Sequence, residues 1–154
     1  MEDQKKRGRY RRIYDQLKEL LMKTDEPISR MASVCAVLHY KMDYFFWTGF
    51  YLFKNDKLIV GPYQGPLACQ ELEKNKGVCW AAVNRAEPVV VKDVHKFPGH
   101  IACDSRSQSD ITLPVFNDRG DIVAVFDVDS DLIGSFNDAD RTHLQQIMKL
   151  IYGY

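Results

Sequence analysis

The sequence predicts an α+β fold in which an antiparallel sheet is flanked by helices. Apolar residues recur at three- and four-residue spacings near both ends of the chain, whereas the middle holds short apolar runs separated by turn residues. The resulting order is helix, helix, strand, strand, short helix, strand, loop, strand, strand, helix, which implies an antiparallel sheet with the helices packed on one side. With 154 residues, 45% of them hydrophobic, the chain has the length and apolar content of a single domain.

Two helices are expected over residues 1–42. The first carries one apolar stripe at helical spacing, formed by Tyr10, Ile13, Tyr14, Leu17, Leu20 and Leu21. Six basic side chains crowd its start and are interpreted as a solvated helix end: Lys5, Lys6, Arg7, Arg9, Arg11 and Arg12. A phosphate- or nucleic-acid-binding patch is the alternative, but Asp15, Glu19 and Glu26 dilute the positive charge.

Residues 24–27 interrupt this helical pattern and restart it. Thr24 or Asp25 can cap the second helix, and Pro27 suits its first turn because no backbone N–H is needed there. The second apolar stripe consists of Ile28, Met31, Ala32, Cys35, Leu38 and Met42. Because Cys35 lies on this stripe, we expect it to fill the core.

The aromatic run over residues 44–53 cannot form an amphipathic helix and predicts a long strand. A turn at residues 55–56 leads to a second strand at residues 58–60, which Pro62 and the glycine and proline after it are expected to end. A loop then reaches Cys69, and the small residues of 77–83 predict a short helix.

The second half of the chain alternates strands with one long polar segment. Strands are expected at residues 88–91, 111–116 and 122–128, and a C-terminal helix at residues 138–152. Asn137 or Asp138 can cap that helix. Residues 93–109 are polar and have no periodicity, and such a long loop inside a small domain is more often functional than not.

Composition and charge exclude several classes of protein. Twenty-one basic residues balance twenty-one acidic ones, so no net charge favours nucleic acid or an anionic membrane. No apolar run reaches the roughly 18–20 residues of a membrane span, and no apolar signal-peptide segment follows the charged N-terminus. A cytoplasmic protein is therefore expected. Four cysteines without an export signal argue against a disulfide framework, and the absence of a CxxC pair argues against structural zinc.

Two acids at the end of a strand mark a candidate site. Asp127 and Asp129 alternate with Val128, so both point to the same face of the strand. The apolar run 122–126 before them predicts a central strand, which places the acids at a cleft where one can have a raised pKa and donate a proton. The alternative is a solvent-exposed face, on which two acids have no special role.

The polar segment 93–109 offers His95, His100 and Cys103 as further candidates. Two histidines and a cysteine at this spacing are compatible with a metal site, and a cysteine near a histidine also fits a thiol hydrolase. No local signature of either class accompanies them in this chain, so both readings stay alternatives.

A series of short motifs occurs in one order along the chain. They are FWTGFYL (46–52), GPYQG (61–65), AC (68–69), GVC (77–79), VH (94–95), GHIACD (99–104), LP (113–114) and DVDS (127–130). In these motifs the chain closely resembles the free methionine-(R)-sulfoxide reductases, a family of GAF-domain proteins. The resemblance implies a single GAF domain over 1–154 with an antiparallel sheet of five or six strands. Residues 1–42 then form the N-terminal helices, and residues 43–154 the sheet, the active-site loops and the C-terminal helix.

The resemblance also implies an activity, the reduction of free L-methionine-(R)-sulfoxide. Cys103 resembles the nucleophile, Cys69 the resolving cysteine, and Cys79 a third thiol that can join disulfide exchange. The residues that resemble substrate-binding carboxylates and pocket walls are Asp110, Asp127, Asp129, Trp47 and Tyr51. Thioredoxin is the implied source of electrons, a homodimer is the implied assembly, and no metal or organic cofactor is implied.

These residue types suit that reaction. The sulfur of a sulfoxide is electrophilic, but its oxygen leaves only when protonated, so a thiolate and a nearby acid are both required. One departure is Asp110, because the family commonly has a glutamate there and an aspartate is one methylene shorter. Two other functions remain open: a catalytically silent GAF sensor of a small molecule, and a redox switch based on a Cys69–Cys103 disulfide.

Overall fold

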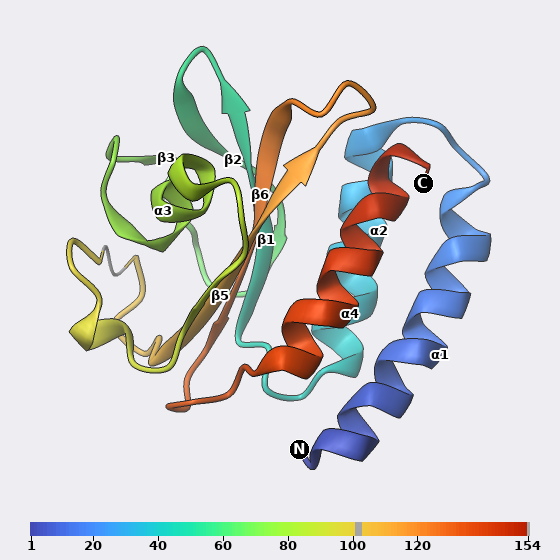
Figure 1. Ribbon diagram of the computed structural model, residues 1–154, viewed down its shortest axis with the longest axis horizontal. Helices are drawn as coiled ribbons and strands as arrows, with labels where there is room; N and C mark the ends of the chain where they lie inside the picture. The colour runs from blue at the N-terminus through green and yellow to red at the C-terminus, as the bar shows by residue number, and fades with distance from the viewer. Residues whose placement is uncertain (101–102, 154) are drawn as a thin grey trace.

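The computed structural model describes residues 1–100 and 103–153, and its centre is a six-stranded sheet with the strand order β3-β2-β1-β6-β5-β4 (Figure 1). The strands are β1 (Trp47–Lys54), β2 (Lys57–Gln64), β3 (Glu71–Leu72), β4 (Val89–Val91), β5 (Ser109–Phe116) and β6 (Ile122–Ser130). Each pairing between neighbouring strands is antiparallel. The predicted α+β class and antiparallel sheet are thus confirmed, and β3 is a short strand that the sequence did not reveal.

Helices cover both faces of this sheet. The helices are α1 (Asp3–Leu21), α2 (Pro27–Lys41), α3 (Gly77–Arg85) and α4 (Asp138–Lys149), with short 3₁₀ turns η1 (Val94–Lys96) and η2 (Leu150–Tyr152). Figure 1 shows α1, α2 and α4 on one side of the sheet and α3 on the other. The prediction that all helices pack on one side is therefore wrong. The second face of the sheet also buries apolar side chains, Tyr51 and Val125 of the central strands among them. It therefore needs a cover too, and Val78, Trp80 and Ala82 of α3 supply it.

Alternation along the central strands creates two separate cores. On β1, Phe50 packs into the core under α1, α2 and α4, whereas Trp47 and Tyr51 point to the side of α3. On β6, Phe126 and Val128 enter the first core, so the acids that alternate with them face the second. The two central strands thus direct both aromatic and acidic side chains toward α3.

The second strand runs further than the sequence indicated. Pro62 does not end β2, which continues to Gln64. Proline is tolerated here because β3 pairs only with Leu58 and Ile59, so the outer edge of β2 has no strand partner at Pro62. On the inner edge, the register with β1 shifts between Gly49 and Tyr51, so Pro62 also falls in an irregular part of the ladder.

The first strand begins later than predicted. Tyr44 and Phe45 precede β1 and pack instead against Phe136, with ring centroids 5.8 and 6.0 Å away. Aromatic residues have a strong strand preference, but here their burial under the helices decides their conformation.

The predicted N-terminal cap is confirmed for α4 but not for α2. Asn137 caps α4 as expected, accepting from the Ala139 N–H within a capping box that Asp140 completes. The predicted cap of α2 is wrong: Glu26 occupies the N-cap position, and the Thr24 hydroxyl accepts from the Glu26 N–H instead. Pro27 does occupy the first turn.

The second apolar stripe is only partly buried. Ile28 and Ala32, which we assigned to it, are exposed, whereas Cys35 is buried as predicted. Burial raises the pKa of the Cys35 thiol, so it stays protonated. In the described part of the chain, no helix is both long and apolar enough to cross a membrane.

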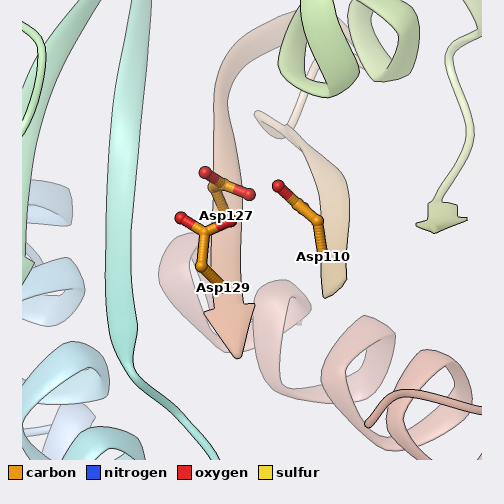
Figure 2. Close-up of side chains that lie close together, drawn as sticks. All are labelled: Asp110, Asp127 and Asp129. Carbon is orange, nitrogen blue, oxygen red and sulfur yellow. The ribbon is translucent and has the colours of Figure 1, made fainter. Parts of the chain in front are cut away.

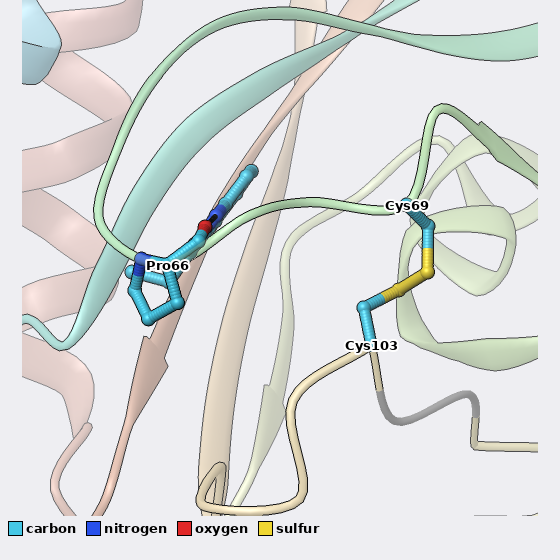
Figure 3. The surroundings of a disulfide bond; sticks show 4 residues. Pro66, Cys69 and Cys103 are labelled. Carbon is cyan, nitrogen blue, oxygen red and sulfur yellow. Dashed lines mark hydrogen bonds between the residues drawn. A yellow bond between two sulfur atoms is a disulfide. The ribbon is translucent and has the colours of Figure 1, made fainter.

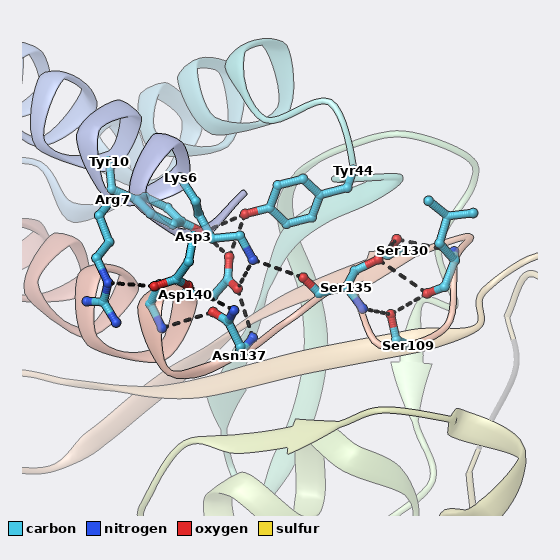
Figure 4. Close-up of polar contacts among 12 residues, drawn as sticks. Asp3, Lys6, Arg7, Tyr10, Tyr44, Ser109, Ser130, Ser135, Asn137 and Asp140 are labelled. Carbon is cyan, nitrogen blue, oxygen red and sulfur yellow. Dashed lines mark hydrogen bonds and ion pairs between the residues drawn. The ribbon is translucent and has the colours of Figure 1, made fainter. Parts of the chain in front are cut away.

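Lys6 is not part of a solvated helix end, contrary to the prediction. Its ammonium lies 2.7 Å from an Asp140 carboxylate oxygen, and the two side chains are only 3% and 0% exposed (Figure 4). The hydroxyls of Tyr10 and Tyr44 donate to the other oxygen of Asp140, each at 2.6 Å. The ion pair therefore joins α1 to α4 through a fully hydrogen-bonded carboxylate.

Candidate active site

Seven of the eight predicted site residues line one cavity between the sheet and α3. They are Trp47 and Tyr51 from β1, Cys79 from α3, Cys103 from the loop before β5, Asp110 from β5, and Asp127 and Asp129 from β6. The eighth, Cys69, is bonded to Cys103. Ile101 and Ala102 of the GHIACD motif lie outside the described residues.

The three carboxyl groups meet because of the strand register. Asp110 lies directly opposite Asp129 in the β5–β6 ladder, and Asp127 is on the same face of β6 (Figure 2). One oxygen of each group lies within 4.8 Å of the others. The solvent-exposed alternative considered for Asp127 and Asp129 is therefore wrong, since Asp127 is 6% exposed and Asp129 is half-buried.

Thr112 connects two of these carboxyl groups. Its hydroxyl oxygen lies 2.9 Å from Asp110 and 2.9 Å from Asp127. A hydroxyl has a single hydrogen, so it donates to one carboxylate at a time. The second carboxyl group can form a hydrogen bond at this distance only when it is protonated, because it then donates to the Thr112 oxygen. The geometry thus favours at least one bound proton in the cluster.

The electrostatic surroundings favour protonation as well. Burial, followed by repulsion from Asp127 and Asp129, raises the pKa of Asp110 well above its ordinary value. Burial and then the charge of Asp127 raise the pKa of Asp129 likewise. Burial also raises the pKa of Asp127, although hydrogen bonds from Asp110 and Thr112 act in the opposite direction. No ion pair to these three carboxylates occurs within residues 1–100 and 103–153.

An aromatic stack forms one wall of the cavity. The Trp47 ring stacks on Tyr51 and Tyr63, with centroids 5.7 and 5.3 Å apart. Gly49 makes this packing possible, because a Cβ there would lie 2.4 Å from the Tyr63 Cβ and 2.6 Å from the Trp47 ring. Tyr63 does not itself line the cavity but supports the Trp47 ring, and it was not among the predicted site residues. Its pairing with Gly49 across β1 and β2 brings it to Trp47 and follows only from the register.

A disulfide between Cys69 and Cys103 bridges two loops at the mouth of the cavity (Figure 3). Their Cα atoms are 5.6 Å apart, although 34 positions separate the residues in sequence. Cys103 is exposed and Cys69 half-buried. The bond therefore lies at the surface, within reach of a second molecule.

Cys79 has a different environment from the other two thiols. It lies buried in the first turn of α3. Burial, and then the charges of Asp127 and Asp110, raise the pKa of its thiol well above the ordinary value. Disulfide exchange requires a thiolate. The surroundings of Cys79 therefore oppose the ionisation that exchange would need.

The two histidines of the long loop separate. His95 is 61% exposed and its Nδ1 lies 3.0 Å from Asp93, whereas His100 lines the cavity together with Cys103. Burial lowers the pKa of His100, and its Nε2 has no hydrogen-bond partner among the described residues. Among the described residues, Asp110, Asp127 and Asp129 are the one group of side chains close enough together to hold a metal ion. The ligand atoms of His95, His100 and Cys103 do not come together in this way.

An ion pair at the rim fixes the chain just after Cys103. The Arg106 guanidinium donates to both carboxylate oxygens of Asp104, at 2.9 and 2.7 Å, and lies over the Phe46 ring with its carbon 4.8 Å from the centroid. The Arg106 hydrogen bond lowers the pKa of Asp104 to about 2. Neither Arg106 nor Thr112 was among the predicted site residues. Only Thr112 has a sequence signal, since it follows Asp110 by two positions on the same strand face.

Fold and site together define an α+β domain with a pocket of thiols and carboxyl groups on one face of its sheet. The sequence profile of the GAF domain matches residues 32–151, and the chain belongs to this family.

Two curated relatives and one solved structure are similar over most of the chain. GAF domain-containing protein A of Dictyostelium discoideum is 42% identical over 147 residues, which are 95% of this chain and 92% of that protein. Free methionine-R-sulfoxide reductase of Escherichia coli is 40% identical over 121 residues, 79% of this chain and 73% of that protein. The X-ray structure of free methionine-R-sulfoxide reductase from Neisseria meningitidis in complex with its substrate has a TM-score of 0.88 and 36% identity, and the match covers 93% of this chain and 86% of that one.

Proposed function

We propose that this protein reduces free L-methionine-(R)-sulfoxide to methionine with its cysteine thiols. The observation that carries the proposal is the Cys69–Cys103 disulfide at the mouth of a cavity whose other wall holds three proton-binding carboxyl groups. A sulfoxide needs both components, a sulfur nucleophile and an acid. The similarity to proteins named free methionine-R-sulfoxide reductase supports this choice of substrate.

In the proposed reaction, Cys103 is the nucleophile. Its thiolate attacks the sulfoxide sulfur, and protonation of the oxygen allows the S–O bond to break with release of water. A water molecule then attacks the Cys103 sulfur of the resulting sulfonium, so that methionine leaves and Cys103 becomes a sulfenic acid. The Cys69 thiol then attacks the Cys103 sulfur, releasing water and forming the disulfide. Two electrons pass from the two thiols to the substrate, and an external dithiol returns them.

The carboxyl groups have two roles in this proposal. A protonated member of Asp110, Asp127 and Asp129 donates to the sulfoxide oxygen, and an ionised member binds the ammonium group of the free amino acid. Among the described residues, no Lys, Arg or His forms an ion pair with these three carboxyl groups. The ammonium group of the substrate therefore meets a carboxylate that has no other cation beside it. Trp47 and Tyr51 enclose the thioether end of the substrate. Cys79 remains a candidate third thiol, although its buried, acidic surroundings favour a structural contact with Asp127.

The proposal has four further parts. The family resemblance implies thioredoxin as the reductant and a homodimer as the assembly, whereas length and composition also favour the cytoplasm as the location and a single GAF domain over 1–154. For the domain, the packing of the α1 residue Lys6 on Asp140 of α4 gives added support, because it ties the N-terminal helix to the part matched by the family profile.

The test is NADPH consumption with thioredoxin and thioredoxin reductase. We expect turnover with free L-methionine-(R)-sulfoxide and none with the (S) epimer or with a sulfoxide-containing peptide. The Cys103→Ser variant serves as the inactive control. A folded, reduced wild-type protein without turnover on any of these substrates would contradict the proposal. It would favour a GAF sensor if methionine sulfoxide still binds, and a thiol redox switch if peroxide alone forms the disulfide.

A further inference from the structure

The loops that carry the two disulfide-bonded cysteines are both fastened to the start of β1. On one side, the Pro66 carbonyl, three positions before Cys69, accepts a hydrogen bond of 3.0 Å from the Trp47 indole nitrogen (Figure 3). Gly65, in the same turn, has a φ of +122°, and a Cβ there would lie 2.8 Å from the Phe46 carbonyl oxygen. This turn is therefore pressed against the backbone at the start of β1, where a side chain would not fit.

On the other side, Arg106 fastens the loop of Cys103 to the same place. The carboxylate of Asp104, the residue after Cys103, accepts from the Arg106 backbone N–H at 2.9 Å and from its guanidinium at 2.9 and 2.7 Å. The same guanidinium lies over the Phe46 ring, with its carbon 4.8 Å from the centroid. Because a guanidinium is planar, it can bind a carboxylate along its edge while its face stacks on a ring.

Phe46 and Trp47 are themselves held to the central strands. The Phe46 backbone N–H donates to the Asp129 carbonyl at 2.8 Å, and Trp47 pairs with Asp129 in the β1–β6 ladder. Two adjacent residues of one strand thus hold a loop on each side, and the Cα atoms of Cys69 and Cys103 come to 5.6 Å. This separation is the one that a disulfide requires.

Arg106 adds little to the stability of the fold. Its side chain is 64% exposed, and an exposed ion pair contributes little to the free energy of unfolding. Its contacts nevertheless join two places that matter for the chemistry, the residue after Cys103 and the residue before the cavity wall Trp47. The effect of these contacts therefore falls on the position of Cys103.

We propose that Arg106, stacked on Phe46, is a positioning residue that holds Cys103 within bonding distance of Cys69. The inference rests on the proposed function in that Cys69 resolves the oxidised Cys103. The contact raises the effective concentration of one sulfur at the other, so it favours the disulfide over the two thiols. When the contact is lost, the loop of Cys103 has more conformations available, and closing the bond costs more entropy.

The experiment measures the equilibrium between the two thiols and the disulfide in glutathione buffers, without sulfoxide. Oxidised glutathione takes two electrons and two protons from Cys69 and Cys103 and leaves as two molecules of reduced glutathione. Alkylation and mass spectrometry of peptides identify the joined cysteines. Because a guanidinium–ring contact at an exposed site is worth about two- to fivefold in an equilibrium constant, Arg106→Gln should lower the constant for disulfide formation by about that factor.

Two further variants separate this contact from a general effect of the substitution. Phe46→Leu keeps an apolar side chain but removes the ring, and it should lower the constant as much as Arg106→Gln does. The double variant should lower it no further, because the same contact is already lost. Arg119→Gln, which changes an exposed arginine in the β5–β6 turn, should leave the constant unchanged. The reduced Arg106→Gln protein should unfold at the same temperature as the reduced wild type, which a merely structural role would not allow.

Four results would overturn the inference. They are an unchanged equilibrium constant in Arg106→Gln, a double variant whose loss is the product of the two single losses, a lower unfolding temperature of reduced Arg106→Gln, or an oxidised protein in which Cys69 and Cys103 are not joined. Failure of the proposed function would appear elsewhere, as absent sulfoxide turnover by a protein whose disulfide responds to these substitutions as expected.

Discussion

The two faces of the sheet each bury carboxyl groups, but they balance the charge in different ways. On the helical face, Asp140 receives hydrogen bonds from Lys6, Tyr10, Tyr44 and the Asn137 backbone. On the face of α3, three aspartates share a cavity, and the Thr112 hydroxyl is hydrogen-bonded between two of them. Asp140 thus has its countercharge within the chain, whereas the three aspartates have none among the described residues.

This difference separates stability from function. A buried ion pair fixes two helices, whereas buried carboxyl groups without a countercharge hold protons and attract a cation from outside. A fold built for stability alone would place apolar side chains at Asp110 and Asp129, as it does at the neighbouring Ile111 and Val128. Stability does not account for these acids without a countercharge, whereas a role in binding and catalysis does.

The largest expected effect comes from breaking the satisfied cluster. Lys6→Met leaves Asp140 as a buried charge without its countercharge, and we expect a loss of about 3–5 kcal/mol in the free energy of unfolding. Urea denaturation measures it. Arg7→Met is the matched control, because the Arg7–Asp3 pair is exposed and its loss should change the stability little. A loss below about 1 kcal/mol in Lys6→Met would show that the tyrosines and the backbone suffice.

A gain in stability is expected when one carboxyl group is removed from the cluster of Asp110, Asp127 and Asp129. Asp129→Asn removes one repelling carboxyl group, so the protein should gain about 1–2 kcal/mol in stability at pH 7. The same variant should lose turnover of methionine sulfoxide, on the order of a hundredfold, because a proton donor or cation ligand is gone. Denaturation and kcat/KM are measured together. Asp131→Asn, which changes an exposed aspartate two positions on, should change neither the stability nor kcat/KM. A loss of stability in Asp129→Asn would contradict the expectation that the Asp129 carboxyl group destabilises the fold.

The stability gain of Asp129→Asn should depend on pH. The folded pKa of Asp129 is raised above its ordinary value of 3.8, so the wild type loses stability as pH rises from that value toward the folded pKa. Below about pH 4 the carboxyl group is protonated in both states, and wild type and variant should be equally stable. Urea denaturation at pH 4 and pH 7 tests this. If the stability gain of Asp129→Asn is the same at both pH values, its cause is packing and not charge.

The smallest effect is expected from Asp110→Glu. The longer side chain restores the residue that the family commonly has, and it should preserve or raise kcat/KM if reach to the substrate is limiting. Because Asp110 is buried opposite Asp129, the added methylene should cost about 1 kcal/mol in stability. Steady-state kinetics decide the matter. A collapse of activity would mean that the pocket has adjusted to the shorter acid.

Local patterns in the sequence determined much of this structure. Helical spacing located α1 and α4, and alternation placed Asp127 and Asp129 on one face of β6, because both periodicities are properties of a short stretch of chain. The motifs identified the family, and with it the cysteines and acids that the structure gathers in one cavity. These results need no knowledge of what packs against each element.

Tertiary structure decided what depends on partners distant in sequence. Lys6 patterns as a solvated residue, and only the approach of α4 buries it against Asp140. Strand register brings the Thr112 hydroxyl to the acids and Tyr63 against Trp47. The helix α3 covers the second face because Tyr51 and Val125 of the central strands also bury apolar surface there. Burial and charge balance belong to the assembled protein, since a side chain's dielectric surroundings and countercharges come from other segments of the chain.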